Sequence, residues 1–322
     1  MKPLIWIIDE EWSDYVIEEE ILKNSFPNCI IKHSGDDYEK DLEDFGKDAD
    51  AILCQVYIDM SKKTIEKLNK CKIIAIYGGG YDRVDVEAAK EKGIKVTSVP
   101  GYCVEDISDY VIAAIFFLNK NLYFYIENSN KGLWGYQASK KIGKRINSST
   151  LFIIGFGRIG RSIAEKAKAI KMNVMVYDPY VKEEVLKEYD VKQVDLETGL
   201  GNADYISINT IYCDETKALI SKKEFKIMKN TAYIINASRG KVINERDMVE
   251  AVKNRTIAGA VLDVIENEPP CGNEDVLNCE NIFVTPHVSY LSIESLEELK
   301  KRASGNVVKI LNGEETSDIV RI

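Results

Sequence analysis

The fold is decided by Leu151-Phe152-Ile153-Ile154, which runs directly into Gly155-Phe156-Gly157-Arg158-Ile159-Gly160. The apolar residues predict a buried strand, and the residues from Arg161 to Ala167 have the pattern of a helix. Glycines spaced in this way between a strand and a helix are typical of a turn that binds a dinucleotide. Gly155 permits the tight turn, Gly157 lets the backbone approach a pyrophosphate, and Gly160 lets the helix pack against the strand. The first N–H groups of the helix, around Arg158 and Ile159, would then face the phosphates.

An acidic residue further along supports this interpretation. Asn173 to Tyr177 predicts the next strand, and Asp178 follows directly at its end. A carboxylate at that position suits a bidentate hold on the ribose hydroxyls of an adenosine. It also favours NAD over NADP, because a 2′-phosphate would face this charge with no arginine in its place. The alternative is an ordinary strand-to-helix turn followed by a surface aspartate.

Length, charge and apolar runs limit the number of domains and the kinds of partner that the chain can have. With 322 residues the chain exceeds the usual size of one domain, so two domains are expected. The net charge of −9 argues against a nucleic-acid partner, which would require a basic face. The longest apolar run, Val111 to Leu118, is too short for a membrane span and predicts a buried helix.

The cysteines and histidines indicate the compartment and argue against a metal. The seven cysteines form no C-x-x-C pair, and a chain of this size does not need a disulfide framework. Met1 leads straight into an apolar strand with no small-residue cleavage site, so we expect reduced thiols in a cytoplasmic protein. Because the chain has only two histidines, His33 and His287, we expect no metal site.

Strands alternate with helices along the whole chain, which predicts parallel sheets and an α/β fold. In the first part we expect strands at Leu4–Ile8, Cys29–Lys32, Ala51–Cys54, Lys72–Ile76 and Ile94–Val99, and helices at Glu10–Asn24, Ser61–Asn69 and Asp85–Lys92. Pro100-Gly101 then interrupts the pattern, and a connecting helix is expected from Glu105 to Leu118, extending as far as Glu127. In the second part we expect further strands at Tyr205–Asn209, Ala232–Asn236, Gly259–Asp263 and Ile282–Thr285, and helices at Lys222–Met228, Glu245–Asn254 and Ser292–Leu311.

Three short segments, each after a strand of the second part, carry the candidate chemistry. They are Asn236 to Gly240, Asp263 to Pro269 and Thr285 to His287. Ligands gather outside the carboxyl ends of strands in such sheets, so these segments would bring a guanidinium, carboxylates and an imidazole to one rim.

Each of these side chains also has a structural alternative. Arg239 could be a surface arginine, Glu268 could cap a loop, and His287 could be a satisfied core histidine. Together they match the needs of hydride transfer to a carbonyl, which are a clamp for a carboxylate, a proton donor and a group that tunes that donor.

With these motifs in order, the chain resembles the D-isomer-specific 2-hydroxyacid dehydrogenase family over nearly its whole length. The resemblance is strongest from Ile73 to Tyr290. It rests on the glycine turn and on the segments Gly78-Gly79-Gly80-Tyr81-Asp82-Arg83-Val84-Asp85, Val99-Pro100-Gly101-Tyr102, Asn236-Ala237-Ser238-Arg239-Gly240, Leu262-Asp263-Val264 running to Glu268-Pro269, and Thr285-Pro286-His287. Pro100 to Glu105 and the helix after Ser292 are most similar to the branch named for the C-terminal binding protein.

The resemblance implies roles for single residues. His287 would be the acid that protonates the carbonyl oxygen and the base in reverse, with Glu268 holding the imidazolium. Arg239 would grip the carboxylate of a 2-oxo acid. The remaining implied contacts are backbone N–H groups at Gly78 and Gly79 for the same carboxylate, Asp263 for the nicotinamide amide, and Thr210 and Ala237 along the cofactor cleft.

The resemblance also implies how the domains are arranged. A flavodoxin-like substrate domain would comprise residues 1–101 and 289–322, and a Rossmann-type NAD domain, residues 102–288, would be inserted in it. The usual assembly of the family is a homodimer built on the inserted domain.

Three positions depart from the pattern of the family. Ile76 stands where phosphoglycerate-type relatives are often basic, which weakens the case for a phosphorylated substrate. Ile211 replaces the usual proline after Asn209-Thr210, so the loop on the cofactor side can differ. Tyr290 stands where the corepressor branch usually has tryptophan. We therefore expect Tyr290 and Tyr102 to line the substrate pocket, with core packing as the alternative.

The sequence thus predicts an NAD-dependent dehydrogenase that interconverts a small 2-oxo acid and the D-2-hydroxy acid. The alternative is an NAD(H)-sensing regulatory protein of the C-terminal-binding-protein type, because those relatives keep the same catalytic residues. The long extra tail that some of them carry is missing here, which favours the enzyme.

Overall fold

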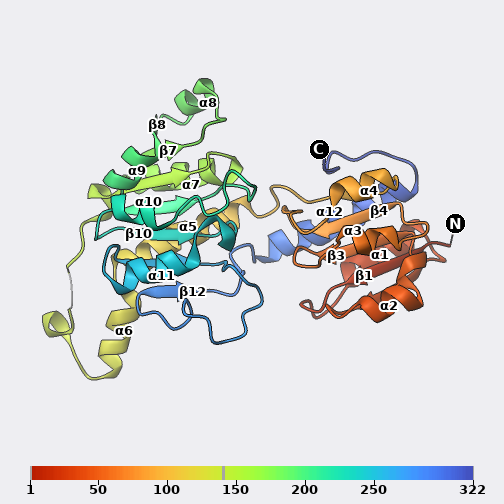
Figure 1. The fold of residues 1–322 in the computed structure, drawn as a ribbon, viewed down its shortest axis with the longest axis horizontal. Coiled ribbons are helices and arrows are strands. Elements are labelled where there is room, and N and C mark those ends of the chain that lie inside the picture. Colours follow the sequence, from red (N-terminus) through yellow and green to blue (C-terminus); the bar gives the residue numbers. More distant parts are fainter. Residues whose placement is uncertain (1, 140–141, 322) are drawn as a thin grey trace. The chain divides into compact units, whose positions relative to one another are not determined.

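The computed structural model describes residues 2–139 and 142–321, which form two compact units (Figure 1). The first unit comprises Met1–Tyr102 with Ser292–Ile322, and the second comprises Cys103–Leu291. The chain therefore leaves the first unit, builds the second and returns. Each unit has one sheet whose paired strands all run parallel.

The first unit is a five-stranded sheet in the order β2-β1-β3-β4-β5, the order of flavodoxin-like folds. Its strands are β1 Leu4–Ile8, β2 Ile30–Ser34, β3 Ala51–Gln55, β4 Ile73–Tyr77 and β5 Lys95–Thr97. Its helices are α1 Val16–Ser25, α2 Glu39–Asp44, the 3₁₀ turn η1 Gly46–Asp48, α3 Lys62–Glu66, α4 Val86–Glu91 and α12 Ile293–Leu311.

Alternation along the strands divides the first unit into two cores. Trp6 and Ile8 of β1 face the layer of α2, α3 and α4, whereas Ile5 and Ile7 face α1 and α12. Helix α12 contributes Leu299, Ala303 and Val307 to the second of these cores, at the four-residue spacing of one helix face. Burying a side chain of this kind stabilises a fold by roughly 1.5–3 kcal/mol, so α12 is an integral part of the first unit.

The second unit is a seven-stranded sheet in the order β12-β11-β10-β9-β6-β7-β8. Its strands are β6 Thr150–Ile154, β7 Asn173–Tyr177, β8 Lys192–Gln193, β9 Tyr205–Ile208, β10 Tyr233–Asn236, β11 Gly259–Leu262 and β12 Ile282–Val284. Its helices are α5 Val104–Asn119, α6 Leu122–Asn130, α7 Arg158–Ala169, α8 Glu183–Glu188, α9 Leu196–Asn202, α10 Lys222–Ile227 and α11 Glu245–Lys253, with 3₁₀ turns η2 Gly135–Ala138, η3 Ile146–Ser148 and η4 Gly240–Val242.

Helices cover both faces of this sheet. Leu151 and Ile153 of β6 pack against α5 and α7, and Phe152 and Ile154 pack against α9, α10 and α11. The strand order reverses between β6 and β9, so the loops after these two strands flank the crevice where such sheets bind ligands. The predicted α/β architecture with a doubly wound parallel sheet is confirmed.

Two helix boundaries differ most from the prediction, and the helix expected to reach Asn69 ends at Glu66. The first helix was expected from Glu10 but begins at Val16. The Asp9 carboxylate accepts the N–H groups of Glu11 and Trp12 and the Tyr15 hydroxyl, which holds the intervening residues in a loop. The connecting helix does not run to Glu127, because Asn121 adopts a left-handed φ of 48° and separates α5 from α6.

Several short elements were missed altogether. Helices α2 and α8 each bury one side chain, Leu42 and Leu186, so their apolar periodicity is too weak to read from the sequence. Among the helices within residues 2–139 and 142–321, none has the length and apolar character needed to cross a bilayer.

Candidate active site

The glycine turn lies at the point where the order of the second sheet reverses. Gly155 has a φ of 90°, and a Cβ atom there would lie 2.6 Å from the carbonyl oxygen of Asn209, just after β9. A Cβ atom on Gly160 would lie 2.2 Å from the carbonyl oxygen of Gly155. Both positions therefore exclude a side chain, because the chain segments pack directly on each other. A Cβ atom on Gly157 would meet no atom within 4 Å, which leaves the approach to the turn open.

The start of α7 and a neighbouring hydroxyl provide hydrogen-bonding groups beside this turn. Gly157 is the N-cap of α7 and has no side chain to accept the first N–H groups, which include those of Arg158 and Ile159. The Oγ1 atom of Thr210, in the loop after β9, is buried without a hydrogen-bond partner among the described residues. An uncapped helix start, an open glycine and an unsatisfied hydroxyl fit the pyrophosphate of a dinucleotide. Ala237 follows β10 at the same edge of the sheet.

Asp178 is fastened to the glycine turn. Its Oδ2 atom accepts the N–H of Phe156 at 2.8 Å, and its Oδ1 atom accepts the N–H of Tyr180 at 2.9 Å. Each oxygen keeps a second lone pair, since a carboxylate offers about four acceptor positions. The carboxylate is therefore held beside the turn with positions left for two hydroxyl donors.

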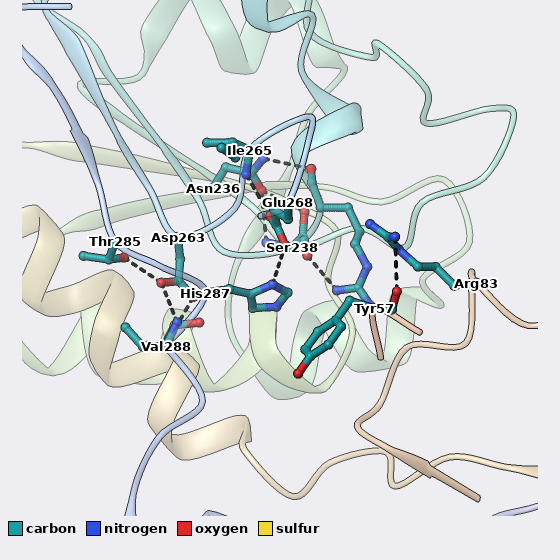
Figure 2. Close-up of polar contacts among 12 residues, drawn as sticks. Tyr57, Arg83, Asn236, Ser238, Asp263, Ile265, Glu268, Thr285, His287 and Val288 are labelled. Atoms are coloured by element: carbon teal, nitrogen blue, oxygen red, sulfur yellow. Dashed lines mark hydrogen bonds and ion pairs between the residues drawn. The ribbon is translucent and has the colours of Figure 1, made fainter. Parts of the chain in front are cut away.

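His287 and Glu268 form a close pair in the second unit (Figure 2). The Nδ1 atom of His287 lies 2.7 Å from Oε2 of Glu268, whose Oε1 accepts the N–H of Ile265 at 2.9 Å. Burial alone raises the pKa of the Glu268 carboxyl, but the hydrogen bond and charge of His287, helped by the charge of Arg239, lower it overall. Because Glu268 is ionised at neutral pH, Nδ1 of His287 carries the hydrogen, and Nε2 is left to exchange a proton with a ligand.

Arg239 is placed by the buried side chain of Asn236, at the end of β10. Asn236 donates from Nδ2 to the carbonyl of Arg239 at 2.9 Å, and its Oδ1 accepts the N–H and the hydroxyl of Ser238 (Figure 2). A Cβ atom on Gly240 would lie 1.9 Å from the carbonyl oxygen of Ile265, so this turn packs directly on the segment that leads to Glu268. The turn of Arg239 and the loop of Glu268 are therefore in contact. The role of Asn236 in placing Arg239 was not predicted from the sequence.

Asp263 holds the loop of His287 from behind. Its carboxylate, 1% exposed, accepts the Thr285 hydroxyl at 2.6 Å and the N–H of Val288 at 2.9 Å on Oδ1, and the N–H of Ser289 at 2.8 Å on Oδ2. Its carbonyl oxygen accepts the N–H of His287 at 2.9 Å. His287 itself has a φ of 55°, a conformation that needs support from its surroundings.

This loop-holding role of Asp263 was missed in the sequence, where the residue was expected only to hold the nicotinamide amide. A signal was available, because Asp263 and Thr285 directly follow β11 and β12, which pair with each other. Polar residues after neighbouring parallel strands meet at one edge of the sheet.

The remaining predicted residues are distributed as follows. Gly78 and Gly79 follow β4 in the first unit, where Tyr102 is half-buried against the core formed with α12. Tyr290 is half-buried in the second unit. The second unit by itself thus contains the glycine turn, Asp178 and the trio of Arg239, Glu268 and His287. Within the part of the chain that the structure describes, no three His, Cys, Asp or Glu side chains are grouped to hold a metal ion.

Comparison with known proteins assigns most of the second unit to a known domain family. Residues 112–289 match the family model described as "D-isomer specific 2-hydroxyacid dehydrogenase, NAD binding domain". A Staphylococcus haemolyticus protein that carries the provisional name 2-hydroxyacid dehydrogenase is 33% identical over 301 residues, 93% of this chain and 94% of that protein. A similarly named protein of Staphylococcus epidermidis is 35% identical over 276 residues, 84% of this chain and 86% of that protein.

Solved structures are similar over the full length. The D-lactate dehydrogenase of Aquifex aeolicus, solved in complex with NAD and lactic acid, has a TM-score of 0.89 and 28% identity, with 98% of each chain covered. The apo D-lactate dehydrogenase of Escherichia coli has a TM-score of 0.82 and 26% identity, covering 99% of this chain and all of that one. The predicted cofactor, NAD, is confirmed by the family match. The chain belongs to the D-isomer-specific 2-hydroxyacid dehydrogenase family.

Proposed function

We propose that the chain is an NAD-dependent dehydrogenase that interconverts a small 2-oxo acid and its D-2-hydroxy acid, with His287 as the acid and base. The observation that carries the proposal is the 2.7 Å contact between His287 Nδ1 and Glu268 Oε2, within the unit that carries the NAD-binding match. An imidazole oriented by a carboxylate through one nitrogen can give or take a proton at the other.

Each residue of the trio would have one task in the reaction. Bound NADH supplies a hydride to the carbonyl carbon of the 2-oxo acid. Nε2 of His287 donates a proton to the carbonyl oxygen, and the Glu268 carboxylate stabilises the imidazolium present before the transfer. Arg239 binds the substrate carboxylate through its planar guanidinium, which matches the two oxygens. In the oxidative direction His287 accepts the hydroxyl proton.

Further residues are proposed for binding. Asp178 holds the adenosine ribose, and the glycine turn with Thr210 and Ala237 holds the rest of the dinucleotide. Three donors already occupy the Asp263 carboxylate, so one acceptor position on Oδ2 remains for the nicotinamide amide. For the substrate we propose backbone N–H groups of Gly78 and Gly79, with Tyr102 and Tyr290 lining the pocket.

We also propose that the protein is a homodimer and acts in the cytoplasm. Helix α6 and the turn after it project beyond the sheet of the second unit (Figure 1) and expose large apolar side chains. They include Ile126, 60% exposed, Trp134, 83% exposed, and Tyr136, 80% exposed. Several large apolar side chains exposed on one projecting segment are typical of a protein interface, and a second copy of the chain is the proposed partner. The cytoplasmic placement rests on the cysteine pattern of the sequence.

The test is NADH oxidation against a panel of 2-oxo acids of different size and charge, with chiral analysis of the product. We expect turnover of at least one small 2-oxo acid to the D-hydroxy acid. His287→Ala should lower kcat by roughly two to four decades, the scale of general acid catalysis, while NADH affinity measured by fluorescence is retained.

Turnover by His287→Ala at the rate of the natural chain would remove that residue from the mechanism, and an L-hydroxy product would refute the stereochemistry. Tight NADH binding without turnover of any panel member would favour the NAD-sensing alternative.

A further inference from the structure

A line of hydrogen bonds connects helix α5 to the loop of His287. The Tyr110 hydroxyl lies 2.7 Å from Oγ1 of Thr285, and Thr285 Oγ1 lies 2.6 Å from Oδ1 of Asp263. Asp263 in turn accepts the N–H groups of Val288 and Ser289, the two residues directly after His287. Figure 2 shows the Asp263 end of this line, with Thr285 on one side and Val288 on the other.

The direction of these hydrogen bonds follows from the number of protons available. A carboxylate with three donors around it accepts only, so the single hydroxyl proton of Thr285 points to Asp263. The Thr285 oxygen must then accept the proton of Tyr110. Burial is the main cause that raises the pKa of Tyr110 to about 12, so the phenol keeps this proton through the neutral range.

Tyr110 is a firm anchor for this line. It lies on α5, a 16-residue helix whose Val111, Ile115 and Leu118 are buried against the second sheet. The loop that it supports contains a histidine in the left-handed region, which requires external support. Glu268 holds the ring of His287 from one side, and Asp263 holds its backbone from the other.

We propose that Tyr110 is a positioning residue for His287, acting through Thr285 and Asp263. Its hydroxyl donates to Thr285, polarises the Thr285–Asp263 hydrogen bond and ties the loop of residues 285–289 to α5. This connection keeps Nε2 of His287 in the position from which it exchanges a proton with the substrate oxygen. This inference rests on the proposed role of His287 as the acid and base.

The test compares kcat and KM for Tyr110→Phe, Thr285→Val and Thr285→Ser. Because misplacement of a catalytic group by a fraction of an ångström weakens proton transfer, we expect Tyr110→Phe to lower kcat on the order of tenfold. Thr285→Val should lower kcat further, and Thr285→Ser, which keeps the hydroxyl, should restore most of it. The KM values for NADH and the 2-oxo acid should change by less than about twofold, because the binding groups are untouched.

Tyr205→Phe is the matched control. Tyr205 also has a buried hydroxyl in the second unit, which accepts a hydrogen bond from Asn119 at 3.1 Å, but it lies on β9 rather than beside the loop. Loss of the Tyr205 hydroxyl should leave kcat unchanged. If Tyr110→Phe and Tyr205→Phe affect kcat and thermal midpoint equally, the role of Tyr110 is only structural and the proposal fails.

Double variants separate this proposal from the proposed function. Tyr110→Phe combined with Thr285→Val should have the kcat of Thr285→Val alone, because both act through one line of contacts. In a His287→Ala background, Tyr110→Phe should cause no further loss. An undiminished effect in that background refutes the positioning role, whereas a fully active His287→Ala variant refutes the proposed function instead.

Discussion

The two parallel sheets use the residues at their carboxyl ends differently. In the first unit, Asp9 follows β1 and Gln55 ends β3, and the two side chains bond to each other at 2.8 Å in the interior. Asp9 also accepts the Tyr15 hydroxyl at 2.6 Å. In the second unit, Asp178 and Asp263 each hold a loop by its N–H groups, and the loop presents other atoms outward.

The difference indicates which of the two sheets can position catalytic side chains at its carboxyl edge. In the first sheet Asp9 fastens the loop between β1 and α1 to Gln55, and no residue proposed for the chemistry lies in that loop. In the second sheet the buried carboxylate of Asp263 holds the loop of His287, and the half-buried carboxylate of Asp178 holds the glycine turn. We therefore expect Asp9 to contribute mainly to stability and Asp263 mainly to activity, and matched substitutions can test this.

Asp263→Asn should produce the largest effect on activity. The amide has one accepting oxygen and a donating NH₂ group, so at least one of the three donors around Asp263 meets another donor. The displaced loop should lower kcat by roughly a hundredfold. Single-turnover kinetics at saturating NADH would measure this, and NADH fluorescence would report separately any loss of the nicotinamide contact proposed for Oδ2. A kcat within about threefold of the natural chain would show that Asp263 does not position His287.

Asp9→Asn makes the same chemical change at the corresponding edge of the first sheet. Here we expect a loss of about 1–3 kcal/mol in the free energy of unfolding, because each Asp9 oxygen accepts from two donors and the NH₂ group of asparagine would face two of the four. Urea unfolding measures the loss, and kcat should stay within a few-fold of the natural value. If activity falls as steeply as in Asp263→Asn while stability is unchanged, the contrast between the units is wrong.

Asp178→Ala should have the smallest effect, on cofactor choice. Removing the carboxylate takes away the acceptors for the ribose hydroxyls and the charge that would repel a 2′-phosphate. We expect the ratio of kcat/KM for NADH over NADPH to fall about tenfold, which corresponds to about 1.4 kcal/mol. An unchanged ratio would place the origin of the NAD preference elsewhere.

Much of the fold was readable in the sequence because its signals are local. Apolar runs bounded by glycines and acids predicted β7 at its observed limits and most other strands to within two residues. The start of α1 was missed because the Asp9 side chain competes for the N–H groups that a helix would use. The break between α5 and α6 depends on the backbone of Asn121, which no periodicity reveals.

For the site, residues that carry chemistry were more predictable than those that support them. Arg239, Glu268 and His287 could be proposed because each follows a strand and carries a reactive group. The supporting residues escaped prediction because their partners are distant in the chain. Tyr110 and Thr285 are 175 positions apart, so only the folded chain reveals the contact.

The place of α12 in the chain has a consequence for how the protein is made. The residues of the second unit, Cys103–Leu291, are continuous, and they are synthesised and emerge from the ribosome ahead of Leu299, Ala303 and Val307. Domains usually fold in the order in which they are synthesised. Here the first unit begins at the N-terminus but completes its core only when α12 has been made. The second unit is therefore free to fold while the face of β1 that packs on α12 is still uncovered.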